Sequence, residues 1–419
     1  MKTIDGVQKN GLCCNCGTCA GICPSGAIAL EVNEEKGFYE PRIDESICTI
    51  CGKCYDICPG YNVDFPSLNI ETFGNEPEDI LLGNYRTCYL GYATDHSVRY
   101  NAASGGAVTA LLIYALEKGI IDGALVTRMS AGNPFKPEPF IARTKDEILS
   151  ASRSKYCPVP TNILLRDILD SDDDMRFAVV GLPCHIQGIR VAELKNKDLK
   201  KKIVLHVGLF CSHTDTFHQT KLLANKLKVS GENIKEINYR GGGWPGKFSV
   251  LLNDGDKKSM PYSEAMLFHK FWINALPRCL LCYDLSAEFA DISCGDPWLP
   301  DIMSNEHVGK SIIISRTNIG EDLCYEAAEN SSLNIKKIDP IKIKQSANMM
   351  QTKKRDIGLR FLIRRLLNKP VPDYKTEFEG AVAMSFLRSI IICFNVWISS
   401  KIRASWFIET LVYIQQKFI

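Results

Sequence analysis

The chain has 419 residues, of which 45% are hydrophobic, and a formal net charge of +2. This composition excludes a disordered protein and predicts two or three globular domains. Eighteen cysteines are more than packing requires. Because no apolar signal-peptide segment precedes them, they predict metal ligands in a reducing cytoplasm. The basic residues do not accompany a recognisable nucleic-acid reading module, so no nucleic-acid partner is expected.

A cysteine motif of the form C-x2-C-x2-C-x3-C-P occurs twice near the N-terminus, the second copy 35 residues after the first. Four thiolates at this spacing are typical of 4Fe-4S clusters, and in two-cluster proteins the fourth cysteine of each run binds the other cluster. The predicted ligand sets are therefore Cys13, Cys16, Cys19 and Cys58 for one cluster, and Cys48, Cys51, Cys54 and Cys23 for the other. The stretch resembles a bacterial-type ferredoxin. Zinc or disulfides fit this spacing less well, and Cys14, off the pattern, is interpreted as a buried small residue.

A glycine pair then precedes a predicted helix. Ser104, Gly105 and Gly106 come before residues 107–118, whose apolar side chains have helical spacing. Such a helix start offers free amides and a positive dipole end to a phosphate, although a plain, tightly packed helix start explains the glycines as well.

Two predicted strands, residues 177–180 and 203–207, are each followed by a cysteine, Cys184 and Cys211. Ligands of open α/β sheets usually lie at the carboxyl ends of strands, although each cysteine taken alone is more often a buried core thiol. Further on, Cys279 and Cys282 form a C-x2-C pair, which fits half of a metal site, a redox dithiol or chance. A metal site needs two more ligands, and Cys184 and Cys211 are the best candidates. Zinc accepts the same four thiolates as an iron–sulfur cluster, so spacing alone does not choose the metal.

The segment 239–247 formally contains G-x-G-x-x-G, but a following strand pattern at 248–252 and the turn at 253–255 predict a hairpin rather than a dinucleotide-binding helix. Arg240, Trp244 and Lys247 on this glycine-rich loop are candidate catalytic residues that grip a planar, anionic ligand. The alternative is a hairpin turn with an exposed aromatic side chain.

Approximately residues 85–320 resemble the coenzyme F420 hydrogenase/dehydrogenase beta-subunit family. The resemblance is carried by the glycine pair before residues 107–118, the cysteines Cys184 and Cys211, and the later C-x2-C pair. The resemblance implies FAD near Ser104, Gly105, Gly106, Ser154, Lys155 and Tyr156, and a third 4Fe-4S cluster on Cys184, Cys211, Cys279 and Cys282. The expected fold is α+β, with a mixed α/β flavoprotein body, an N-terminal ferredoxin-like two-cluster domain and a helical C-terminal tail. The expected divisions are a ferredoxin-like domain at 1–66, a linker at 67–84, body regions at 85–168 and 169–340, and a basic tail at 341–419.

The tail is electrically distinct from the rest of the chain. Residues 353–419 contain 12 Lys and Arg but 5 Asp and Glu, a net charge of +7. Its apolar runs, which include Trp397 and Trp406, are too short to span a bilayer. Two interpretations stay open: the tail packs on the body or on a partner subunit, or it lies on an anionic membrane surface at the inner face of the membrane.

Three functions fit this sequence. The first is an oxidoreductase that moves electrons between coenzyme F420 and the 4Fe-4S clusters through FAD. The second is a reductase that uses ferredoxin to reduce a metabolite, such as a sugar derivative or a tetrapyrrole. The third is a non-catalytic electron-transfer subunit of a larger complex.

Overall fold

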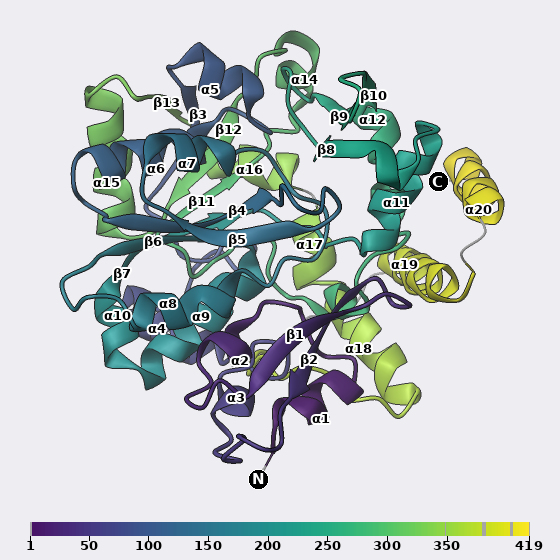
Figure 1. The fold of residues 1–419 in the computed structure, drawn as a ribbon, viewed down its shortest axis with the longest axis horizontal. Coiled ribbons are helices and arrows are strands. Elements are labelled where there is room, and N and C mark those ends of the chain that lie inside the picture. The colour runs from purple at the N-terminus through teal and green to yellow at the C-terminus, as the bar shows by residue number, and fades with distance from the viewer. Residues whose placement is uncertain (1, 348, 379–382, 403–404, 419) are drawn as a thin grey trace.

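The computed structural model describes residues 2–347, 349–378, 383–402 and 405–418. In this part of the chain the main sheet has eight strands (Figure 1). In spatial order they are β13 (Leu333–Lys337), β3 (Thr87–Ala93), β12 (Ser311–Ser315), β11 (Ile292–Gly295), β7 (Ile203–Leu209), β6 (Phe177–Gly181), β4 (Gly123–Met129) and β5 (Pro137–Ala142). The central strands β11, β7, β6 and β4 are parallel to one another, and antiparallel strands flank them on both sides.

Helices cover both faces of this sheet, because its strands alternate side chains between two apolar cores. On β4, Ala124 and Val126 pack toward α6 (Ala107–Glu117) and α15 (Asn318–Glu329), whereas Leu125 packs toward α9 (Pro183–Lys195) and α10 (Lys197–Lys202). Shorter helices complete the body. They are α5 (His96–Asn101), α7 (Lys145–Ser150), η1 (Thr161–Leu164), α8 (Leu165–Leu169), η3 (Pro277–Leu281) and α14 (Pro300–Asn305).

The N-terminal module contains α1 (Ile4–Lys9), α2 (Thr18–Gly21), α3 (Lys53–Asp56) and a hairpin of β1 (Ile28–Asn33) and β2 (Phe38–Ile43). The sequence repeat is also a structural repeat. Gly17 and Gly52, 35 positions apart, precede α2 and α3 with φ of 87° and 78°, left-handed values that favour glycine. This module shares its apolar core with α9 and α10 of the body.

A second, smaller sheet consists of β8 (Ile234–Asn238), β9 (Lys247–Leu252) and β10 (Lys257–Pro261), with α11 (Phe217–Lys226), η2 (Gly231–Asn233), α12 (Tyr262–Ala265) and α13 (Leu267–Lys270) around it. The hairpin predicted after the glycine-rich loop is confirmed, since β9 and β10 pair antiparallel. The predicted fold class, a mixed α/β body with an N-terminal ferredoxin-like module and a helical tail, is also confirmed.

The segment expected to link the ferredoxin-like domain to the body contains helix α4 (Phe65–Phe73). Asp64 caps its first turn by accepting a hydrogen bond from the Ser67 amide, and Pro66 occupies an early position. Gly74 ends the helix at a φ of 81°. Proline, aspartate and glycine therefore act here as helix-boundary residues rather than as loop residues.

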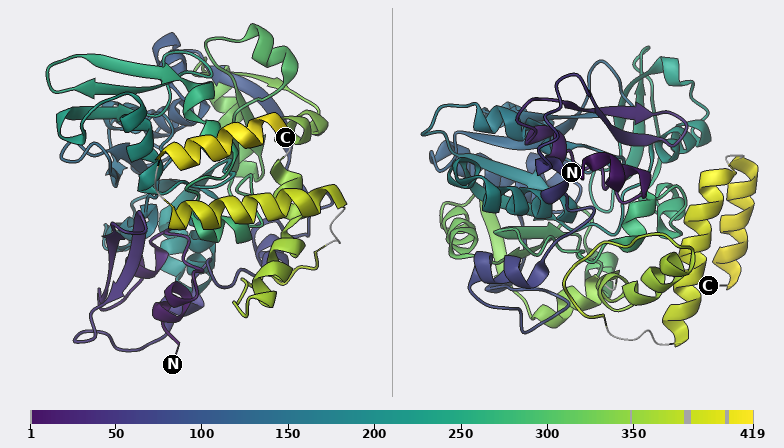
Figure 2. Two further views of the ribbon diagram at one scale, coloured as in Figure 1. Left: turned by 90° about the vertical axis from the view of Figure 1, so that its right-hand side faces the viewer. Right: turned by 90° about the horizontal axis from the view of Figure 1, so that it is seen from below.

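The tail forms α16 (Pro340–Ser346), α17 (Met349–Lys354), α18 (Ile357–Leu366), α19 (Ala383–Lys401) and α20 (Ser405–Phe418), which confirms its helical prediction. Figure 2 shows α19 and α20 side by side on the outside of the molecule. Ile392 and Val396 of α19 pack against Trp272, and Ile408 and Val412 of α20 pack against Phe268. Among the described residues no helix is both long and apolar enough to cross a membrane. The side chain of Trp406 lies outside the described residues.

Candidate cluster sites and cofactor cavity

The eight N-terminal motif cysteines form two groups in space. The thiols of Cys19 and Cys58 interact electrostatically with those of Cys13 and Cys16, and we call these four residues the inner group. The outer group comprises four cysteines that line one small hollow, namely Cys23, Cys48, Cys51 and Cys54. Each group contains one cysteine from the other run, as the sequence predicts for two clusters. Their role as ligands stays a prediction.

The two groups differ in their surroundings. Cys16, Cys19 and Cys58 of the inner group are buried, and a side chain at Gly17 would collide with Ile163 and Pro160 of the body. In the outer group Cys51 is exposed. The inner group therefore faces the body, and the outer group lies at the surface.

A third set of cysteines, the body group, gathers at the carboxyl ends of the central strands. Cys184 lies in the first turn of α9 after β6, and Cys211 follows β7. The thiol of Cys184 interacts with those of Cys282 and Cys211, and Cys211 interacts with Cys279 and Cys282. Residues nearly a hundred positions apart thus form one thiol-lined site, with the ligand set that the family resemblance implies.

The spacing of these thiols bears on the choice of metal. Among the described residues, no three cysteine sulfurs lie within 4.8 Å of one another. A single tetrahedral zinc ion with Zn–S bonds of about 2.3 Å would hold its sulfurs about 3.8 Å apart. A cubane cluster needs a wider arrangement, because each thiolate binds a different iron. The described cysteines are therefore not arranged for a single zinc ion, and 4Fe-4S clusters on them stay a prediction.

The inner group and the body group are neighbours. The thiol of Cys14, which is outside the predicted ligand sets, interacts electrostatically with the thiols of both Cys16 and Cys184. Asn162 holds the two parts together, because its amide donates to the Thr18 hydroxyl (2.8 Å) and to the His185 carbonyl (2.9 Å). A ligand candidate of each group thus interacts with the same thiol.

A cavity of about 1300 Å³ lies beside the body group. This volume exceeds the 300–1,000 Å³ of ordinary ligand pockets, so a dinucleotide and a second planar molecule have room. The start of α6, the ends of β6 and β7 and the loop before η1 form its walls. Its lining includes Cys211, and aromatic side chains such as Tyr156, Tyr262 and Trp298.

Five of the six predicted FAD-binding residues line this cavity. Ser104, Gly106, Ser154, Lys155 and Tyr156 line it. Gly105 does not, and a side chain there would meet the Gly91 carbonyl and the Ser311 amide at 2.7 Å, so it serves close packing. The helix start and the cavity volume fit a dinucleotide.

Lys155 also stabilises the loop that forms this part of the cavity wall. Its ammonium donates to the carbonyls of Ala151, Ser152 and Arg153 at 2.6–3.1 Å, just past the end of α7. Burial, together with the nearby Arg153 charge, lowers the pKa of Lys155 to about 7. The same charge thus stabilises the loop and lies on the cavity wall.

The three candidate catalytic residues do not surround one ligand. Arg240 is buried and pairs with Asp296 (3.0 Å), while its guanidinium stacks over Tyr262 at 4.2 Å. Trp244 is also buried and donates its indole N–H to Asp296 (2.7 Å). Lys247 is exposed at the start of β9. Asp296 and Tyr262 line the cavity, so Arg240 and Trp244 support its wall from behind.

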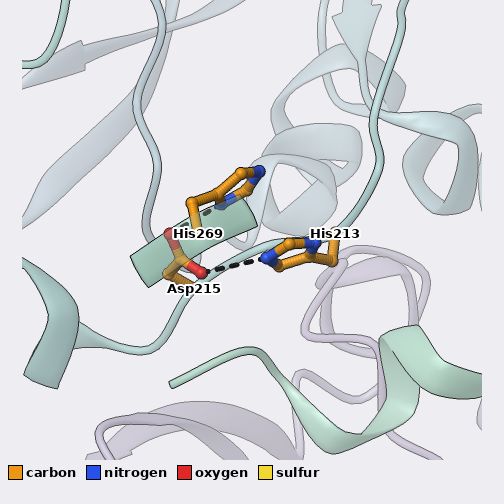
Figure 3. A group of neighbouring side chains, drawn as sticks. All are labelled: His213, Asp215 and His269. Atoms are coloured by element: carbon orange, nitrogen blue, oxygen red, sulfur yellow. Dashed lines mark hydrogen bonds and ion pairs between the residues drawn. The ribbon is translucent and has the colours of Figure 1, made fainter. Parts of the chain in front are cut away.

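Sequence reasoning missed a cluster of His213, Asp215 and His269 at the cavity wall (Figure 3). Asp215 lies 2.9 Å from Nδ1 of His269 and 3.2 Å from Nε2 of His213. The two imidazoles stack at 3.8 Å, and each presents one ring nitrogen to the Asp215 carboxylate. We therefore interpret the cluster as a carboxylate that orients two imidazoles. Both His213 and Asp215 follow Cys211 at the end of β7, which is a signal that could have found them.

The charges in this cluster depend on one another. Burial and the neighbouring His269 lower the pKa of His213 to about 4. Burial alone would raise the pKa of Asp215, but His269 and His213 lower it to about 2. Ser212 lies 3.1 Å from Nε2 of His269, on the cavity side of the cluster.

The two N-terminal cysteine groups and the ligand cavity indicate an iron–sulfur protein of an oxidoreductase class. Comparisons with known proteins agree with this class. Residues 88–166 and 174–341 match the N- and C-terminal models of the coenzyme F420 hydrogenase/dehydrogenase beta subunit, and residues 12–62 match a 4Fe-4S dicluster domain. The chain belongs to this beta-subunit family.

Curated relatives include coenzyme F420 hydrogenase subunit beta of Methanothermobacter thermautotrophicus, 32% identical over 63% of this chain and 88% of that protein. The subunit of the same name from Methanosarcina barkeri is 30% identical over 63% of this chain and 86% of that protein. A coenzyme F420-dependent sulfite reductase of Methanocaldococcus jannaschii is 26% identical over 81% of this chain, which spans half of that protein's length.

A solved structure has the same fold. A chain of the F420-reducing NiFe hydrogenase complex from Methanosarcina barkeri superposes with a TM-score of 0.57 and 27% identity, over 71% of this chain and 99% of that one.

Proposed function

We propose that this protein is a flavin and iron–sulfur oxidoreductase that exchanges electrons with coenzyme F420. The observation that carries the proposal is the contact between the large cavity and Cys211, because it puts a dinucleotide-sized site directly against the body group. Relatives named for coenzyme F420 support the choice of electron partner. When bound, FAD exchanges hydride with a two-electron partner and single electrons with clusters.

The residues of the chain have separate tasks in this proposal. The start of α6, with Ser104 and Gly106, would hold the FAD pyrophosphate through amides and helix dipole. Lys155 adds positive charge to the same wall. Asp215 holds the imidazole of His269 at the cavity wall, where it would be available to exchange a proton with a bound flavin or its partner.

The body group would hold a third 4Fe-4S cluster on Cys184, Cys211, Cys279 and Cys282. The four sites follow one another in space as cavity, body group, inner group and exposed outer group. This order supports an electron path from the interior to the surface. The path has no preferred direction by itself, since the same contacts serve oxidation and reduction.

A second candidate is an electron-transfer subunit whose chemistry is completed by a partner protein. The exposure of Cys51 favours it, because the outer group is positioned for exchange with another protein. The tail favours it too. Helix α19 leaves five large apolar side chains 40–60% exposed, namely Phe386, Leu387, Ile390, Phe394 and Trp397. We call these five residues the exposed stripe, and we propose that it attaches to a partner subunit or to an anionic membrane surface.

Metal and flavin analysis of anaerobically purified protein tests the cofactor assignment. The expected content is about twelve iron atoms and one FAD per chain, from three clusters. Cys282→Ser should lose about four iron atoms, whereas the control Cys393→Ser, on the tail, should lose none. About eight iron atoms with one zinc in the unaltered protein would remove the third cluster from this account.

A further inference from the structure

The tail contributes a buried lysine to the body group. Lys353, on α17, is 1% exposed. Its ammonium lies 3.3 Å from the sulfur of Cys282 and donates to the Asp284 carbonyl at 2.8 Å. It also interacts with the thiols of Cys211 and Cys279. Three of the four body cysteines therefore share one cationic neighbour.

The position of this lysine is fixed by the next tail helix. Arg360 of α18 donates to the Leu280 carbonyl (2.6 Å), inside the C-x2-C loop, and to the Thr352 carbonyl (2.7 Å), next to Lys353. Arg360 thus ties α17 to the loop that presents Cys279 and Cys282. The family match ends at residue 341, so Lys353 and Arg360 belong to a segment beyond the matched body.

We propose that the positive charge of Lys353 stabilises the reduced form of the body cluster and so raises its reduction potential. The inference rests on the proposed function, because it requires a cluster on the body group. Reduction adds one electron and therefore one negative charge to a cluster whose ligands are already anionic. A cation within hydrogen-bond distance of a ligand sulfur, in a site with little water, favours that added charge.

Lys353 lies beside the body group, which is at the centre of the proposed electron path. The body group lies between the cavity and the inner group. The reduction potential of a cluster on it would therefore decide how readily electrons pass from a cofactor in the cavity to the inner group. A tail segment outside the matched family region would then set the potential of the cluster at the centre of the path.

Redox titration of the anaerobic holoprotein, followed by electron paramagnetic resonance, tests the inference. The signal of the body cluster is identified by its absence in Cys282→Ser. Lys353→Gln keeps a donor for the Asp284 carbonyl but removes the charge, and it should shift the midpoint of that signal to a more negative potential. Lys353→Arg keeps the charge and should leave the midpoint close to that of the unaltered protein. Lys202→Met is the matched control, because Lys202 is an equally buried ammonium that donates to the Leu169 and Ser171 carbonyls instead.

The outcomes are distinguishable. If unaltered protein and Cys282→Ser give the same signals, the body cluster of the proposed function is absent. If the cluster is present and Lys353→Gln leaves its midpoint unchanged, the charge inference is wrong. If Lys353→Gln loses the cluster, Lys353→Arg decides: retention of the cluster near the original potential supports a role of the charge, and its loss shows a role in packing alone.

Discussion

The guanidinium of Arg278, the residue before the body C-x2-C pair, donates from Nε to the backbone carbonyl of Leu12, the residue before the first N-terminal motif cysteine, at 3.1 Å. The same side chain also donates to the carbonyls of Gly60 (3.0 Å) and Pro59 (3.3 Å), which follow Cys58. One buried arginine thus connects the loop of the body group to both chain segments of the inner group. It fixes the separation of two predicted cluster sites.

Arg278→Met should therefore destabilise the whole protein. Three backbone carbonyls would lose their donor in a buried place, and each unsatisfied group costs about 1–3 kcal/mol. The variant should unfold at a clearly lower temperature under anaerobic conditions. Arg176→Met is the control, because Arg176 is 46% exposed and its pair with Asp122 should be worth less than about 1 kcal/mol. Equal unfolding temperatures for the two variants would show that Arg278 does not hold the modules together.

Ser104→Asp should lower the flavin content of purified protein. It puts a negative charge at the start of α6, where the proposed pyrophosphate would bind, and the helix dipole that attracts phosphate also tolerates the carboxylate. The fold should therefore persist, with unchanged iron content. Ser97→Asp is the matched control, since Ser97 is exposed on α5 and outside the cavity. Full flavin occupancy in Ser104→Asp would exclude this end of the cavity as the phosphate site.

Binding of FAD by flavin-free protein should weaken as the pH rises above about 7, where Lys155 loses its charge. The sign follows from linkage: an anion near Lys155 favours the protonated amine, so its pKa is higher with FAD bound, and binding takes up a proton. Titrations followed by flavin fluorescence at several pH values measure the effect. In Lys155→Arg the dissociation constant should vary less over the same range, because arginine stays protonated. An equally steep dependence in that variant would assign the proton to another group.

The exposed stripe should be needed for attachment of the tail. If its target is an anionic membrane, the protein should float with anionic vesicles at low salt, bind less as the Debye length falls to about 8 Å, and ignore neutral vesicles. Phe394→Ser combined with Trp397→Ser should then abolish binding without loss of iron. If the protein does not bind anionic vesicles at low salt, the membrane is excluded as the target of the exposed stripe, and a partner subunit is left. Truncation after Gln351 is a poor test, since it removes Lys353 and Arg360 from the body group.

Local patterns predicted much of this structure. The cysteine spacing predicted the grouping of the inner and outer cysteines, because short loops leave few arrangements for ligands two and three residues apart. The strands that precede Cys184 and Cys211 could be predicted from their apolar runs, and parallel pairing of β6 and β7 then brings the two cysteines to one sheet edge.

Long-range contacts could not be predicted in this way. Nothing near Arg240 in the sequence indicates that Asp296 will pair with it, so the sequence suggests a ligand grip or a hairpin turn with an exposed aromatic side chain, and not a support of the cavity wall. Lys353 is in a tail that composition describes only as basic. Its function depends on the fold that brings α17 to Cys282, across 71 residues of chain.

The most direct test of the account is the addition of reduced coenzyme F420 to anaerobic holoprotein, with flavin absorbance and cluster paramagnetic resonance recorded together. The account predicts that the flavin absorbance is lost first and that signals of reduced clusters then appear. In Cys282→Ser the flavin should still be reduced, while reduction of the N-terminal clusters becomes slow. A flavin that stays oxidised in the presence of reduced coenzyme F420, or N-terminal clusters reduced equally fast without Cys282, would contradict it.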